Sequence, residues 1–269
     1  MMVLTLPLAY AATDTYTAVN SNKYEYGSRG TITSYKPAIT NNVSSDHRDY
    51  MVYTVSGKKH TIGAGMNWYK TNAGSIIGWL MVYVHDPSNS SYQGVHYVYS
   101  GYTYTQNSVT VSASTCKATS STSTTCNPAA SGYCLIGSVV DPNTGYSLSK
   151  GHCYGTVDNT NFTTGIPGAT SRAFSTYTPN QNTLTNLFDN LQFLWYDGSN
   201  QGWASFNGDS RAGVWIVESK CLSNNNNSNP TGWVIDFLDG ARKFGTGPPT
   251  YTTDDCVIDA VNWEPGDEP

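Results

Sequence analysis

The chain has 269 residues, of which 12% are charged and 13% are aromatic, and its formal net charge is −5. Low charge with many aromatic residues excludes an intrinsically disordered chain, whose composition is the reverse. The 14 basic against 19 acidic side chains exclude the basic surface that nucleic-acid binding needs, so we expect no nucleic-acid partner.

The N-terminal segment, residues 1–12, is apolar and ends in Ala9-Tyr10-Ala11. Small residues in this pattern are typical of a signal-peptide cleavage site, although the segment lacks a basic start and Pro7 interrupts it. The alternative is an extended apolar arm. We expect residues 1–22 to form this arm or a residual signal peptide, and residues 23–269 to form a single domain.

Alternation of apolar and polar residues with a period of two dominates the first half of the chain and predicts strands. Val, Thr and Tyr are frequent in these segments and fit a pleated, half-buried surface. Turn signals rich in Gly, Pro, Asn and Asp separate them. The predicted strands cover residues 29–35, 50–55, 60–69, 76–85, 95–104 and 108–113.

The second half continues in short strands, with Asp197-Gly198 and Asn207-Gly208 as hairpin signals. The exception is the segment 184–191, where apolar residues have helix-like spacing and predict one or two helical turns. Many short strands between turn signals predict an all-β, antiparallel, jelly-roll-like sandwich. The predicted strands cover residues 134–140, 191–196, 202–206, 212–217, 233–238 and 257–263.

Six cysteines without a Cys-x-x-Cys pair predict disulfides rather than a zinc or thioredoxin site. Disulfides require an oxidising compartment, so we expect the protein to be secreted or on the cell surface. We expect sequential pairing and a Ser/Thr-rich, disulfide-pinned insertion over about residues 115–156. The expected pairs are Cys116 with Cys126, Cys134 with Cys153, and Cys221 with Cys256.

Two further features concern the surface. Sequons for N-glycosylation occur at Asn42, Asn89, Asn161 and Asn226, although an Asn/Ser/Thr-rich chain also produces such triplets by chance. The longest apolar run after the N-terminal segment, residues 76–84, falls short of the roughly 20 residues that a membrane-spanning helix needs. We therefore expect no transmembrane anchor.

Glutamates are scarce, and Glu218 is the one that ends an apolar strand. A strand end would hold its carboxylate firmly, as one member of the acid pair that cleaves a glycosidic bond. The alternative is a surface residue that pairs with Lys220 or Arg211.

The histidines do not form a compact metal-binding motif. His85 and His96 flank a loop and would be close enough for a shared metal if they faced each other across a hairpin. A plain surface role is the alternative, and we assign no metal or cofactor. His152 beside Cys153 resembles a nucleophile pair, but the expected disulfide would remove that thiol.

Trp68 and Trp203 have polar neighbours in the sequence and are candidates for stacking against sugar rings. Trp79, Trp195 and Trp215 lie within apolar runs and are better interpreted as core residues.

Three motifs resemble the catalytic domain of neprosin-type glutamic peptidases. The first is Tyr26-Gly27 with Thr31-Ile32 and Pro37-Ala38-Ile39, which is similar to the opening of that domain. The second is Ile62-Gly63-Ala64-Gly65-Met66, and the third is the Trp-containing segment 195–207 with Gly208. The resemblance implies an antiparallel β-sandwich.

The departures from that family concern its catalytic residues. The family's first catalytic glutamate falls on Gly63, and its Gly-Gly-Glu motif does not follow Trp215. Glu218 is the nearest acid, in different surroundings. The resemblance therefore implies the fold and argues against the activity.

Our main hypothesis from sequence is a non-catalytic extracellular subunit that assembles with copies of itself into a filament or surface layer. Leu4, Leu6 and Leu8 of the arm would fill pockets on a neighbour by β-strand addition. The first alternative is an enzyme, either a secreted neprosin-like peptidase or a glycoside hydrolase that uses Glu218. The second is a carbohydrate-binding sandwich.

Overall fold

The computed structural model describes residues 14–21, 26–37, 44–55, 58–92, 96–132, 134–154, 171–179, 186–205, 215–222, 231–232, 235–237, 244–246, 250–251 and 257–263. Regular structure in these ranges is β-strand, apart from the short 3-10 turn η1 (Ser90–Tyr92). None of the described segments is a helix with the length and hydropathy needed to cross a bilayer. The predicted all-β antiparallel sandwich is confirmed.

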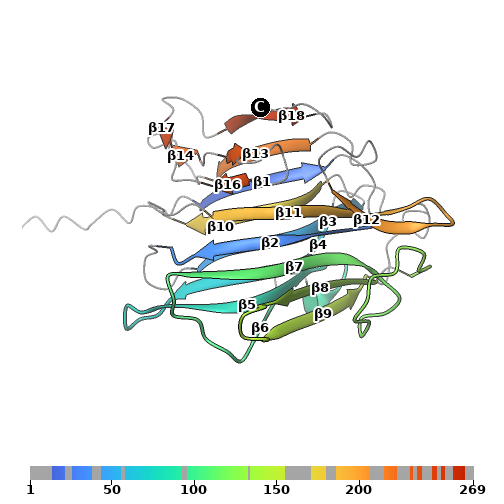
Figure 1. The fold of residues 1–269 in the computed structure, drawn as a ribbon, viewed down its shortest axis with the longest axis horizontal. Coiled ribbons are helices and arrows are strands. Elements are labelled where there is room, and N and C mark those ends of the chain that lie inside the picture. The colour runs from blue at the N-terminus through green and yellow to red at the C-terminus, as the bar shows by residue number, and fades with distance from the viewer. Residues whose placement is uncertain are drawn as a thin grey trace, which may run out of the picture.

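Sheet A contains eight strands and runs from one end of the molecule to the other (Figure 1). All of its pairings are antiparallel. In spatial order its strands are β18 (Val257–Trp263), β13 (Trp215–Leu222), β1 (Asp14–Ser21), β10 (Ser171–Pro179), β3 (Ser44–Val55), β4 (Lys58–Lys70), β5 (Ile76–His85) and β6 (His96–Tyr99).

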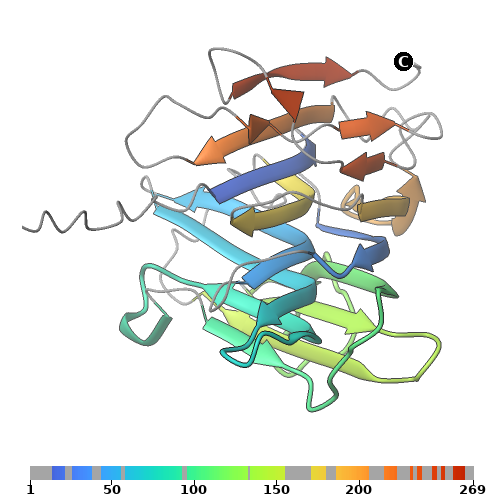
Figure 2. The ribbon, with the colours of Figure 1, turned by 90° about the vertical axis from the view of Figure 1, so that its left-hand side faces the viewer.

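Sheet B packs against sheet A as the second layer, and the turned view separates the two (Figure 2). Its strands are, in spatial order, β15 (Ile235–Phe237), β16 (Phe244–Thr246), β11 (Asn186–Tyr196), β2 (Gly27–Tyr35), β7 (Ser108–Ala118), β8 (Cys134–Val140) and β9 (Ser147–Cys153). Strand β12 (Gln201–Ser205) also pairs with β11, and β14 (Thr231–Gly232) pairs with β17 (Thr250–Tyr251).

The core fills the space between the sheets. Strand β4 contributes Ile62, Ala64, Met66 and Trp68, all fully buried, while its alternate residues face away from sheet B. This alternation is the pleat of a strand that packs one face on a core. Further core residues are Ile32, Met51, Leu80, Val82, Val84, Val111, Leu135, Val139, Tyr154 and Phe193.

Strand β1 lies inside sheet A. It pairs with β10 on one side, where Ala18 is opposite Ser175, and with β13 on the other, where Ala18 is opposite Glu218. Both edges of this strand are therefore satisfied within its own sheet. Residues 14–21 of the expected arm have no unpaired edge to add to a neighbouring copy, and Leu4, Leu6 and Leu8 lie outside the described residues.

The helical turns expected over 184–191 are wrong, because the described part of that segment belongs to strand β11. The strand pairs with β2, and its register shifts between Asp189 and Gln192 at a β-bulge. Asn190 in the bulge has a φ of 55°. An extra residue interrupts the period of two, and this interruption explains why the apolar spacing resembles that of a helix.

The disulfides Cys116–Cys126 and Cys134–Cys153 form as predicted. The insertion is shorter than expected, because β7 continues to Ala118 and β8 and β9 are regular strands of sheet B. Cys256 lies outside the described residues, so the third pair stays a prediction. The neighbours of the two remaining cysteines, Lys220 and Val257, are directly paired between β13 and β18.

Candidate functional site

The candidate site lies on the face of sheet A that points away from sheet B, which we call the outer face. Strand β3 shows how the two faces divide. His47 and Asp49 hydrogen-bond to side chains of sheet B, so Asp46 and Arg48, which alternate with them, belong to the outer face. Asn67 of β4 is directly opposite Asp46 and shares that face.

Asp46 is the centre of a polar cluster, which we define as Asp46, Arg48, Asn67 and Tyr97. Arg48 Nη1 donates to Asp46 Oδ2 over 2.9 Å, and the Tyr97 hydroxyl donates to the same oxygen over 3.1 Å. Asn67 Nδ2 donates to the other oxygen, Oδ1. Asp46 is 1% exposed. Charge-assisted bonds of this kind offset the cost of burying a carboxylate.

Arg48 is also held by aromatic rings. Its guanidinium carbon lies 4.4 Å from the ring centroid of Tyr83 and 5.7 Å from that of Tyr50. Such cation–π contacts strengthen when the cation is shielded from water. The cluster therefore fixes a cation within a sheet face, bound on one side by a carboxylate and on the other by rings.

Burial controls the acidity of the nearby phenols. It raises the pKa of Tyr99 to about 12, with a further contribution from the negative charge of Asp46. The same two causes raise the pKa of Tyr97 still further, and burial raises the pKa of Tyr83. These hydroxyls stay protonated near neutral pH and act there as hydrogen-bond donors.

An aromatic row, Tyr69, Trp79, Tyr99, Tyr97 and Tyr83, extends the cluster across β4, β5 and β6. Neighbouring ring centroids along it lie 5.5–6.4 Å apart. Tyr97 and Tyr99 are parallel to within 3° and are 39% and 43% exposed. The row therefore offers an apolar surface with polar edges beside the cluster, a combination suited to binding an extended ligand.

Gly63, where the family resemblance places a catalytic glutamate, has no space for a side chain. A Cβ atom there would lie 2.0 Å from Cε1 of Tyr83, which is directly opposite on β5. The Tyr83 ring occupies the space above Gly63. This chain therefore lacks the first acid of that family for a steric reason as well as by sequence.

Glu218 is placed on the same sheet by its register. It is opposite Ala18, which is opposite Ser175, which is opposite Arg48. The positions of Glu218 and Arg48 therefore belong to one row across sheet A, at a point where the register between β13 and β18 shifts between Val217 and Ser219. Three strand spacings separate their Cα atoms by about 14 Å along the sheet.

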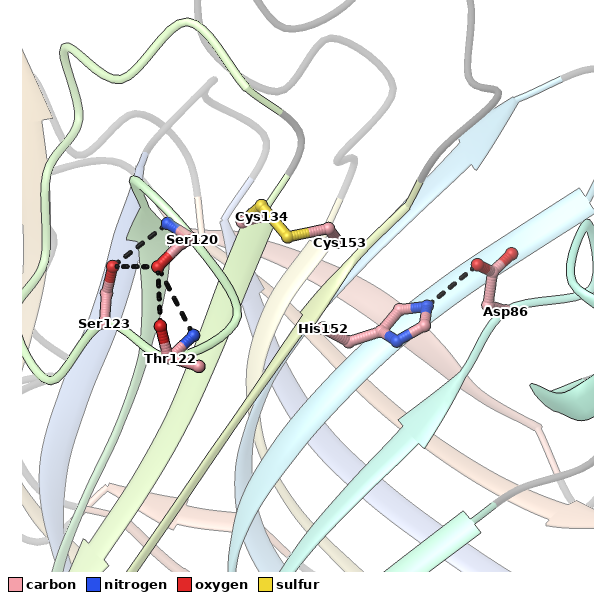
Figure 3. The surroundings of a disulfide bond; sticks show 7 residues. All are labelled: Asp86, Ser120, Thr122, Ser123, Cys134, His152 and Cys153. Atoms are coloured by element: carbon pink, nitrogen blue, oxygen red, sulfur yellow. Dashed lines mark hydrogen bonds and ion pairs between the residues drawn. A yellow bond between two sulfur atoms is a disulfide. The ribbon is translucent and has the colours of Figure 1, made fainter.

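A second polar cluster lies at the edge of the sandwich near the Cys134–Cys153 disulfide (Figure 3). Nε2 of His152 on β9 contacts Oδ2 of Asp86 over 2.9 Å, and Nε2 of His60 on β4 lies 3.5 Å from Oδ1 of Asp86. All three are nearly fully buried. Because His152 belongs to sheet B and Asp86 follows β5 of sheet A, this cluster joins the two sheets.

His85 and His96, which we considered for a shared metal without assigning one, are not directly opposite each other. The residue opposite His96 is Val84, whereas His85 is opposite Thr61. The ring of His96 lies beside Tyr92, with centroids 4.9 Å apart. Among the described residues, no group of three His, Cys, Asp or Glu side chains has the geometry of a metal site.

The remaining site candidates from sequence are Trp68, Trp203 and Cys153. Trp68 is completely buried and donates from Nε1 to Ser34 Oγ, so it has no ring face for a sugar. Trp203 is half-buried on the outer face of sheet B, with Arg29 4.3 Å from its ring. Cys153 is oxidised, which removes the thiol of a nucleophile pair with His152.

Of the four sequons, Asn89 lies in the described chain, where its Oδ1 accepts from the backbone N–H of Ser91. Asn42, Asn161 and Asn226 lie outside it.

Sequence reasoning missed the Asp46 cluster. The predicted strand began at Tyr50, which left Asp46 and Arg48 outside it, and β6 was not expected to present a paired ring stack. The available signal was the alternation of Asp46, Arg48 and Tyr50, and of Tyr97 and Tyr99, at every second position.

We compared the chain with known proteins by family, by sequence and by structure, and only the structural comparison found similar proteins. No protein-family model matches the chain, and no curated protein matches its sequence. The structure is similar to a scytalido-glutamic peptidase with a transition state analog inhibitor, with a TM-score of 0.50 and 11% identity over 88% of this chain and 100% of that chain.

Two further crystal structures are similar at the same coverage. One is scytalido-glutamic peptidase with a peptide-based transition state analog, with a TM-score of 0.48 and 9% identity. The other is SCP-B, a member of the Eqolisin family of peptidases, in complex with the tripeptide Ala-Ile-His, with a TM-score of 0.46 and 10% identity.

The expected filament subunit is wrong. The likeness to a glutamic peptidase supports, at the level of the fold, the resemblance drawn from sequence. Residues 14–21 of the expected arm are paired on both edges within sheet A, whereas Leu4, Leu6 and Leu8, which the hypothesis placed in a neighbour's pockets, lie outside the described residues.

Proposed function

We propose that this chain is a secreted hydrolase of polypeptides, with the outer face of sheet A as its substrate-binding surface. The observation that carries the proposal is the row that brings Glu218 into register with Arg48. An acidic position and a fixed cation then belong to one row across the same sheet. The fold shared with a glutamic peptidase agrees with this assignment.

In the proposed reaction, Glu218 acts as the general base. It takes a proton from a water molecule, whose oxygen attacks the carbonyl carbon of the scissile peptide bond. The carbonyl oxygen becomes an oxyanion, which a hydrogen-bond donor close to Glu218 must stabilise. Arg48, about 14 Å from Glu218 along the sheet, instead binds the substrate farther along the same row. Glu218 then returns the proton to the leaving nitrogen as the carbon–nitrogen bond breaks.

Asp46 has a positioning role in this scheme. Its two oxygens already accept from Arg48, Tyr97 and Asn67, so it holds the donors in place rather than acting on water. The aromatic row supplies contacts for substrate side chains on either side of the scissile bond.

The test is hydrolysis of denatured casein and of a fluorogenic peptide library by the full chain, across pH 3–8. Glu218→Gln should lower kcat by about 100-fold or more, because it keeps the shape of the residue and removes the base. Asp197→Asn, which alters an acid in the exposed β11–β12 turn, is the control and should keep full activity.

The Asp46→Asn variant should raise KM more than it lowers kcat, because Asp46 positions the donors that bind the substrate, while the unfolding transition stays cooperative. No turnover by the wild-type chain on either substrate, or full turnover by Glu218→Gln, would reject the hydrolase assignment.

A further inference from the structure

The opposite side of the molecule carries a concave surface, on the face of sheet B that points away from sheet A. This groove has a volume of about 480 Å³, within the range of small-molecule and cofactor sites. Its polar lining comes from β2, β7, β8 and β11: Arg29, Thr31, Ser112, Ser114, Ser138, Asn190 and Gln192. We call it the hydroxyl groove.

The register of the sheet explains the lining. Arg29 is opposite Ser114 and Gln192, and Ser114 is opposite Ser138. Directly opposed residues lie on one face, so short hydroxyl side chains form the floor while Arg29 and Gln192 form one side. Each hydroxyl both donates and accepts a hydrogen bond, which matches the hydroxyl groups of a sugar.

Arg29 is held in a fixed orientation at this side. Its Nε donates to Gln192 Oε1 over 2.7 Å, and its guanidinium carbon lies 4.3 Å from the Trp203 ring centroid. In the described part of the chain, neither Nη atom has a hydrogen-bond partner. A stacked guanidinium with free Nη groups is prepared for a bidentate bond to a carboxylate.

We infer that the hydroxyl groove binds a carboxylate-bearing glycan, with a uronate residue at Arg29 and neighbouring sugar hydroxyls on the serine floor. Arg29 is the one charged side chain in the lining, so a single carboxylate would meet a matching charge. The inference is independent of the proposed hydrolase, because the two surfaces lie on opposite sheets. In a hydrolase, such a groove would hold the protein on an acidic polysaccharide matrix.

The test compares two forms of one ligand by isothermal titration calorimetry with the full chain. Oligogalacturonate should bind, and its fully methyl-esterified form, which has the same sugars without the charge, should bind at least tenfold more weakly. Raising the salt concentration should weaken the binding of oligogalacturonate and leave the binding of the esterified form unchanged.

Variants then locate the site. Arg29→Gln should reduce the affinity for oligogalacturonate at least tenfold. The affinity of Arg29→Lys should lie between those of Arg29→Gln and the wild type, because lysine keeps the positive charge but cannot donate two parallel hydrogen bonds. Lys150→Gln, which removes an exposed cation from β9 outside the groove, should bind as the wild type does. Equal binding of the charged and esterified ligands, or unchanged binding by Arg29→Gln, would overturn the inference.

Discussion

His47 is an imidazole enclosed between the two sheets. Its Nδ1 is hydrogen-bonded to Ser34 Oγ over 2.7 Å and its Nε2 to Ser45 Oγ over 3.1 Å. Burial lowers the pKa of His47 from 6.5 to about 3, since no solvent reaches the ring to stabilise a positive charge. The folded protein therefore keeps this residue neutral where the unfolded chain would protonate it.

This difference predicts an acid-sensitive fold. His47 contributes its full stability above pH 6.5, and that contribution is lost as the pH falls from 6.5 towards 3, because the unfolded state binds the extra proton. The free energy of unfolding should fall by up to about 1.4 kcal/mol per pH unit across this window.

The measurement is urea unfolding of the wild type and the His47→Gln variant between pH 3 and 7. In His47→Gln, the free energy of unfolding should depend less steeply on pH than in the wild type. His96→Gln, at an exposed position, should keep the pH dependence of the wild type. Parallel plots of the free energy of unfolding against pH for the wild type and His47→Gln would contradict the prediction.

At the scale of elements, the β8–β9 hairpin depends on a covalent link. Cys134 and Cys153 are directly paired in register and joined by a disulfide that closes 19 residues of sequence. His152, the residue before Cys153, makes the contact with Asp86 that joins this edge of sheet B to sheet A. The disulfide thus supports a contact between sheets as well as the hairpin.

Replacing both cysteines, as Cys134→Ser with Cys153→Ser, should reduce the free energy of unfolding by about 3 kcal/mol, chiefly because the unfolded chain gains freedom. Guanidinium unfolding gives this value directly. Cys116→Ser with Cys126→Ser is the matched comparison, and it should cost somewhat less because its loop spans 10 residues. A larger loss for this shorter loop would contradict the loop-entropy explanation.

At the scale of the whole molecule, one carboxylate joins the two sheets. Asp49 of β3 in sheet A accepts from Ser28 Oγ of β2 over 2.5 Å and from Thr115 Oγ1 of β7 over 3.0 Å. All three residues are fully buried. A buried carboxylate that loses its donors keeps its desolvation cost without compensation.

The double substitution Ser28→Ala with Thr115→Val should therefore destabilise the fold by about 3 kcal/mol or more, because hydrogen bonds to a charged group are strong. Thermal and urea unfolding measure the loss. Thr33→Val with Thr110→Val removes a hydroxyl pair from the same two strands at a part-buried position, and should change stability by about 1 kcal/mol or less. Equal effects of the two double variants would contradict a special role for Asp49.

Local sequence patterns correctly predicted the fold class, the strand over Ile76–His85 with its two ends, and two disulfide pairs. These features depend on local alternation and on cysteines close together in sequence. The segment 184–191 was misread as helical, because a bulge interrupts the alternation where its described part belongs to β11, and a bulge depends on the partner strand.

The candidate site was decided by tertiary structure alone. Asp46, Asn67 and Tyr97 come from three strands, and Glu218 comes into line with Arg48 through two further strands. Strand order and register are properties of long-range pairing, which no local pattern encodes. The low charge of the chain thus leaves few acids and bases, and the pairing of distant strands determines which of them meet.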